Sequence, residues 1–141
     1  MNKNKVTLTE LLNDVEFAFK KLNELISVDD FCSCEAYPLQ QFVELKLNLS
    51  TVRDTLNQLV FREINAGYSN YFDVLNTAKI NADVAISLIE VLIHTNPCCN
   101  GNEICNVLNI VGRINTELCL LVANLVFLTH VDSNKCKCCC Q

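Results

Sequence analysis

Residues 104–128 read ICNVLNIVGRINTELCLLVANLVFL, and this stretch decides the fold class. Its apolar residues recur at alternating steps of three and four, which is the 3.5-residue period of helices that pack at a shallow angle. The period holds over eight successive positions: Ile104, Val107, Val111, Ile114, Leu118, Leu121, Leu125 and Leu128. The pattern predicts a long helix over residues 103–130 with one apolar stripe.

Three earlier segments carry the same period and predict helices over residues 7–27, 38–66 and 70–95. Their stripes, in chain order, are Leu8, Leu11, Val15, Ala18, Leu22 and Leu25; Phe42, Leu45, Leu49, Val52, Leu56 and Leu59; and Tyr71, Leu75, Ala78, Ala82, Ala85, Ile89 and Leu92. We therefore expect an all-α protein whose core is built from four stripes.

The residues between these segments indicate where the helices begin and end. Thr7 with Glu10 forms the pattern of a capping box at the first helix, and Pro38 suits the first turn of the second. Gly67 suits a C-terminal cap, and Pro97 follows the third helix. Short connections favour antiparallel neighbours, so we expect an up-down-up-down antiparallel four-helix bundle.

Composition agrees with a single helical domain. Half of the 141 residues are hydrophobic, enough for one sizeable core, and only three glycines and two prolines are present. A β-barrel or sandwich needs more turn residues than this. We expect residues 1–131 to form the bundle and residues 132–141 to form a cysteine-rich C-terminal tail.

Charge and hydropathy argue against several partners. The net charge of −5 and the absence of a basic stripe argue against nucleic acid. No apolar run of signal-peptide length follows the N-terminus, and the longest uncharged stretch, residues 118–131, is short for a membrane span and contains Asn124. We expect synthesis in the cytoplasm, with neither a signal peptide nor a transmembrane segment.

Ten residues are cysteines, and the predicted topology sorts them by the end of the bundle. One end would hold the cysteines beside the first and third connections, and the tail would hold the others. Cys119 lies within the fourth helix, where we expect a buried small apolar residue without a role. The remaining nine are predicted cross-linking residues: Cys32, Cys34, Cys98, Cys99, Cys105, Cys136, Cys138, Cys139 and Cys140.

Metal binding is the alternative use of these thiols. His94 precedes Cys98 and Cys99, with Cys32 and Cys34 expected at the same end, and zinc accepts such nitrogen and sulfur ligands. The tail resembles the cysteine runs of metallothioneins, which suit copper or zinc. Outside the tail no two cysteines have the Cys-x-x-Cys spacing, and none of the catalytic motifs occurs, so we expect neither an enzyme nor a required cofactor.

The third and fourth predicted helices also carry apolar residues away from their stripes. Exposed apolar residues of this kind mark protein contacts, so we expect self-association through these two helices. The predicted assembly interface consists of Val84, Leu88, Val91, Ile110, Leu120 and Phe127.

The chain is cysteine-rich and rich in Asn and Lys, and it ends Lys135-Cys136-Lys137-Cys138-Cys139-Cys140-Gln141. In these features it resembles the cysteine-rich coat and exosporium proteins of spore-forming bacteria. The resemblance implies a protein made in the mother cell that self-assembles on the spore surface and becomes cross-linked by disulfides. Its implied partners are further copies of itself and other cysteine-rich coat proteins.

Overall fold

Four α-helices make up the regular structure of the described residues in a computed structural model of the whole chain. They are α1 (Lys3–Ile26), α2 (Leu39–Ala66), α3 (Ser69–Thr95) and α4 (Glu103–Thr129), with 24, 28, 27 and 27 residues. The structure describes residues 3–27, 38–66, 69–95 and 103–129. The described residues form an all-α fold, as predicted.

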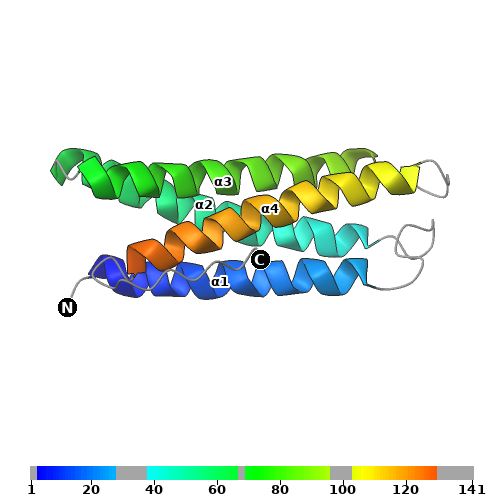
Figure 1. Cartoon of the computed structure of the whole chain (residues 1–141), viewed down its shortest axis with the longest axis horizontal. Coiled ribbons are helices and arrows are strands. Elements are labelled where there is room, and N and C mark those ends of the chain that lie inside the picture. Colours follow the sequence, from blue (N-terminus) through cyan, green and yellow to red (C-terminus); the bar gives the residue numbers. More distant parts are fainter. Residues whose placement is uncertain (1–2, 28–37, 67–68, 96–102, 130–141) are drawn as a thin grey trace.

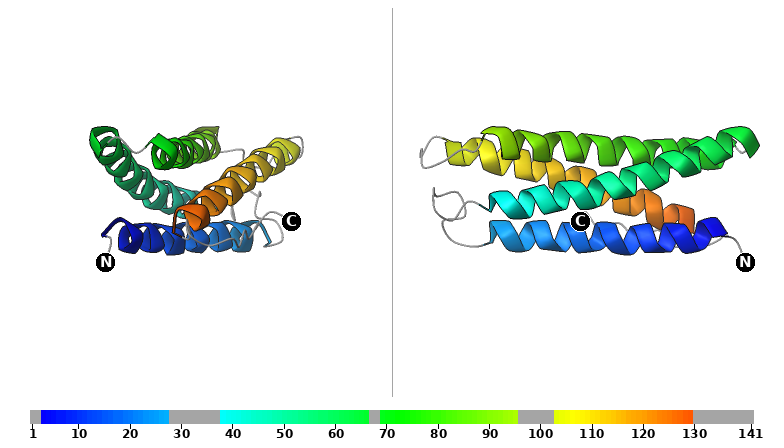
Figure 2. Two further views of the ribbon diagram at one scale, coloured as in Figure 1. Left: turned by 60° about the vertical axis from the view of Figure 1, so that its left-hand side comes forward. Right: turned by 180° about the vertical axis from the view of Figure 1, so that it is seen from behind.

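Successive helices run in opposite directions, as the colours in Figure 1 show, so the predicted up-down-up-down bundle is confirmed. Each helix contacts its neighbours in the order α1, α2, α3, α4, and α4 closes the ring against α1. Figure 2 shows α2 and α4 crossing obliquely between α1 and α3. As a result, α4 begins beside α3 and ends beside α1.

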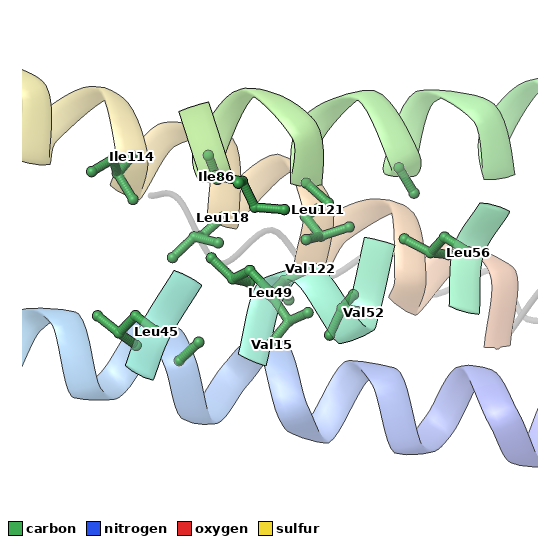
Figure 3. Packing of buried hydrophobic residues seen from close by; sticks show 14 of the residues in the cluster. Val15, Leu45, Leu49, Val52, Leu56, Ile86, Ile114, Leu118, Leu121 and Val122 are labelled. Carbon is green, nitrogen blue, oxygen red and sulfur yellow. The ribbon is translucent and has the colours of Figure 1, made fainter. Parts of the chain in front are cut away.

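The bundle is held together by its apolar stripes, part of which Figure 3 shows at close range. Every stripe position whose side chain is described is buried, apart from Leu25, which is half-buried against the core. Full burial of a leucine or phenylalanine side chain contributes about 1.5–3 kcal/mol relative to exposure. The stripes of all four helices form one contiguous cluster, which accounts for the fold.

The helix ends differ from the prediction in two places. Helix α1 begins at Lys3, so Thr7 lies inside it and the predicted capping box is wrong. Residues 3–6 contain neither proline nor glycine, and nothing there stops the helix from extending by a turn. Pro38 precedes α2, and its carbonyl accepts a hydrogen bond from the Phe42 N–H at 3.0 Å, so it occupies the N-cap position. Gly67 lies outside the described residues.

Candidate assembly surface on helices α3 and α4

A partly buried polar cluster links α3 to α4. Asn81 of α3 is only 7% exposed. Its Nδ2 donates to Glu117 Oε1 at 3.1 Å, and its Oδ1 accepts from Asn124 Nδ2 at 2.9 Å. Along the bundle axis, Asn81 therefore lies at the height of the α4 segment between Glu117 and Asn124, and Leu120 is in the middle of that segment.

This register identifies the residues that point outward beside the α3·α4 seam. The side of α3 that holds Asn81 faces α4, and the side of α4 that holds Glu117 and Asn124 faces α3. Next to these positions, on the side of each helix that turns away from the core, residues spaced by seven form one row along α3 and one row along α4. We call these two rows together the seam face: Thr77, Val84 and Val91 on α3, and Arg113, Leu120 and Phe127 on α4.

The structure brings together most of the predicted interface residues on or beside this seam face. Val91, Leu120 and Phe127 are 41%, 45% and 48% exposed. Val84 and Ile110 are half-buried and pack against the core at the edge of the seam. These five residues come from two helices but lie along one side of the bundle.

Leu88 is a correction to the predicted interface. It is 9% exposed and belongs to the core cluster. Leu88 follows Asn81 by seven residues and so lies on the same line of α3, directly against α4. The 3.5-residue period identified the central stripe but not this flanking position, which the neighbouring helix covers.

Some exposed apolar residues were not predicted from the sequence. Ile80 and Leu108 on α3 and α4 are 48% and 47% exposed, whereas Phe17, Leu47 and Phe61 are exposed on α1 and α2. Their signal is the same as that of the predicted interface, namely an apolar residue that lies off the stripe of its helix. Single exposed apolar residues are common on folded proteins, so exposure alone does not mark a contact surface.

The side of the bundle formed by α1 and α2 differs from the side formed by α3 and α4 more in its exposed charged residues than in its exposed apolar residues. The exposed charged residues of α1 and α2 are numerous: Glu10, Asp14, Glu16, Lys20, Glu24, Glu44, Asp54 and Arg62. Among described side chains of α3 and α4, Asp73, His94 and Arg113 are exposed, and Lys79, Asp83, Glu90 and Glu117 are partly exposed, with Lys46 and Arg53 of α2 paired to Glu90 and Asp83. Interface cores are depleted in charged residues, so the α3 and α4 side has the composition of a contact surface.

The α2·α3 seam differs in character, because ion pairs cross it. Lys46 Nζ lies 3.5 Å from Glu90 Oε2, and Arg53 Nε lies 3.7 Å from Asp83 Oδ1. These side chains are partly solvated, and such pairs contribute at most about 1 kcal/mol each. They make this seam hydrophilic at its rim and a poor surface for a further apolar contact.

Most of the predicted cross-linking cysteines lie outside the described residues: Cys32, Cys34, Cys98, Cys99, Cys136, Cys138, Cys139 and Cys140. Cys105 lies in the first turn of α4, but its side chain is also outside the description. No disulfide joins two cysteines within the described part of the chain. The cross-linking role of these nine residues stays a prediction.

Cys119 requires a correction. It is buried, as predicted, at 5% exposure, but it is disulfide-bonded. The interpretation of Cys119 as an inert apolar residue is therefore wrong. No sequence spacing pointed to this pairing, because a disulfide partner depends on which segments meet in space.

The metal-site alternative lies mostly outside the description as well. His94 is an exposed residue in the last turn of α3, and its four proposed cysteine companions are not described. Within residues whose placement is described, no group of three or more His, Cys, Asp or Glu side chains could hold a metal ion. The described helices therefore offer no separate metal centre.

Helix α4 has a second notable property. Its segment Val107–Thr129, of 23 residues, is long and apolar enough to cross a membrane by length and composition. This is longer than the uncharged stretch considered in the sequence, because it includes Arg113 and Glu117. In the bundle the stripe of this helix packs against α1 and α3, and 39% of the apolar window is buried.

Comparison with known proteins adds no family. The chain matches no protein-family model, and neither a curated protein nor a solved structure matches it at a significant level.

Proposed function

We propose that this protein is a structural subunit that associates with further copies of itself through the seam face and is then cross-linked by intermolecular disulfides. The observation that carries the proposal is the charge-poor, apolar side formed by α3 and α4, opposite a charged side on α1 and α2. A monomer in water gains nothing from exposing Leu120 and Phe127, whereas a contact between copies would bury them.

The expected strength of this contact explains why thiols would be needed. Burial of each large apolar side chain contributes about 1.5–3 kcal/mol, while association costs roughly 4–15 kcal/mol in lost translational and rotational freedom. A patch with three exposed large apolar residues therefore supports a reversible contact. Covalent links would make such an assembly durable, and the cysteine content of the chain could supply them.

A spore outer layer is the setting that we propose for this assembly. The support is the resemblance in composition and tail to cysteine-rich coat and exosporium proteins, together with a fold that suits a packing unit. Such a layer is built from proteins of the mother cell, so it would combine many cysteines with synthesis outside the secretory route. Neither an enzymatic activity nor a bound cofactor is part of the proposal.

Two matched double variants test the surface. Leu120→Asp with Phe127→Asp places charges on the seam face, and Leu47→Asp with Phe61→Asp places the same charges on α2. Leu47 and Phe61 are even more exposed, at 61% and 66%, so neither pair disrupts the core. Sedimentation velocity in reductant should show self-association of the parent and the α2 variant, and a monomer for the seam-face variant.

Circular dichroism of both variants provides the folding control, because the helix content should match that of the parent. If the two variants associated equally well, the seam face would not be the contact surface and the proposal would be refuted. Loss of association in the α2 variant alone would instead assign the contact to the opposite side of the bundle.

A further inference from the structure

The outward line of α4 has an internal symmetry. Arg113, Leu120 and Phe127 are spaced by seven residues and are all exposed, so they lie on one line along the helix. At 1.5 Å per residue, Arg113 and Phe127 lie about 10 Å on either side of Leu120. The residues at intermediate levels on the same side, Thr116 and Ala123, are small.

We propose that two copies of the chain pair through this line in antiparallel orientation, about a two-fold axis that passes beside Leu120. Leu120 then meets Leu120 of the second copy, and each Arg113 meets Phe127 of the other copy. This inference rests on the proposed function, since it names the partner and the geometry of the same seam face.

The chemistry of the three residues favours the antiparallel arrangement. A guanidinium group packs well on an aromatic ring, and the two-fold axis makes this contact twice. Within the described residues Arg113 has no ion-pair partner, so its side chain is available for such a contact. A parallel pairing of the same line would place the two Arg113 side chains against each other, with repulsion between like charges.

The small residues beside Leu120 allow the two helices to approach. Thr116 donates its hydroxyl to the Gly112 carbonyl at 3.1 Å, so its polar group is satisfied within its own helix. Ala123 has no polar side-chain atom. A second α4 can therefore pack over this part of the line without leaving a buried side-chain donor or acceptor unpaired.

A charge test at Phe127 separates this register from other contacts. Phe127→Glu would meet Arg113 of the second copy with an attractive charge, whereas Phe127→Lys would meet it with a repulsive one. In reductant, sedimentation equilibrium should give a dimer that is roughly tenfold tighter for the Glu variant than for the Lys variant, because both pairs change sign together. In an Arg113→Glu background the order should reverse.

Phe61→Glu and Phe61→Lys on α2 are the matched controls and should give equal dimer affinities, since Phe61 is exposed on another helix. If the Glu and Lys variants at residue 127 dimerise equally in both backgrounds while Leu120→Asp still abolishes the dimer, the antiparallel register is wrong but the seam face stands. If the parent chain is monomeric in reductant, the proposed function and this inference both fail.

Discussion

The side chains of Asn81 and Asn124 meet across the α3·α4 seam, where Asn124 Nδ2 donates to Asn81 Oδ1 at 2.9 Å. Apolar stripes with a regular period can pack in several registers that differ by whole turns. A buried polar group that finds its partner in a single register distinguishes between them, and Asn81 finds both Asn124 and Glu117. This polar cluster therefore specifies which residues of α3 and α4 come to lie on the same side.

Replacing Asn81 should weaken the bundle. Asn81→Ala leaves the Glu117 carboxylate and the Asn124 amide without their partner, and we expect a loss of about 1–3 kcal/mol in the free energy of unfolding. Asn48→Ala on the exposed surface of α2 is the control and should change this free energy by less than about 0.5 kcal/mol. Urea denaturation followed by circular dichroism measures both. Equal effects of the two substitutions would show that the cluster contributes no stability.

The apolar stripe should account for much of the stability. Leu118→Ala removes a side chain that is 1% exposed, and we expect the free energy of unfolding to fall by about 2–5 kcal/mol. Leu47→Ala removes the same atoms from a side chain that is 61% exposed and should cost less than about 0.5 kcal/mol. The same denaturation experiment compares them. A similar cost at both positions would contradict the arrangement of α4 in the core.

Cys119 should resist thiol reagents in the native, oxidised protein, because it is buried and forms a disulfide. Iodoacetamide treatment followed by peptide mapping should leave Cys119 unlabelled before reduction and label it after reduction and unfolding. The unfolded but unreduced protein is the control, since it exposes the residue without breaking the bond. Labelling of Cys119 in that control would show that the disulfide is absent.

The tail cysteines should add durability without contributing to the fold. Replacement of Cys136, Cys138, Cys139 and Cys140 by serine removes thiols that follow the last helix, so the helix content should be unchanged. We expect assemblies of this variant to dissociate in denaturant without reductant, unlike those of the parent. Light scattering during a urea titration measures this difference. If the variant resisted urea as well as the parent does, the cross-links would have to involve other cysteines, such as Cys32, Cys34, Cys98 and Cys99.

The helices and the core could be predicted from the sequence, because the 3.5-residue period depends on residues close together in the chain. Each described stripe residue lies in the core or packs against it. Features that depend on a neighbouring helix were missed. Leu88 is covered by α4, and the polar cluster around Asn81 exists only once α3 and α4 are placed together. The disulfide of Cys119 likewise requires a partner that local pattern does not reveal.

The start of α1 was missed for a different reason. Thr7 and Glu10 fit a capping box, but that motif requires its first residue to be the N-cap, and Thr7 lies inside α1. Residues 3–6 do not oppose helix formation, and the helix continues to Lys3. Local cap signals are therefore weaker predictors than the stripe period in this chain.

The central claim is that the chain associates with itself without covalent links, and sedimentation equilibrium of the unmodified protein in reductant tests it most directly. The account predicts an average mass above the 15.9 kDa of a single chain, falling towards that value on dilution. A mass of 15.9 kDa at every concentration up to the millimolar range would contradict the account.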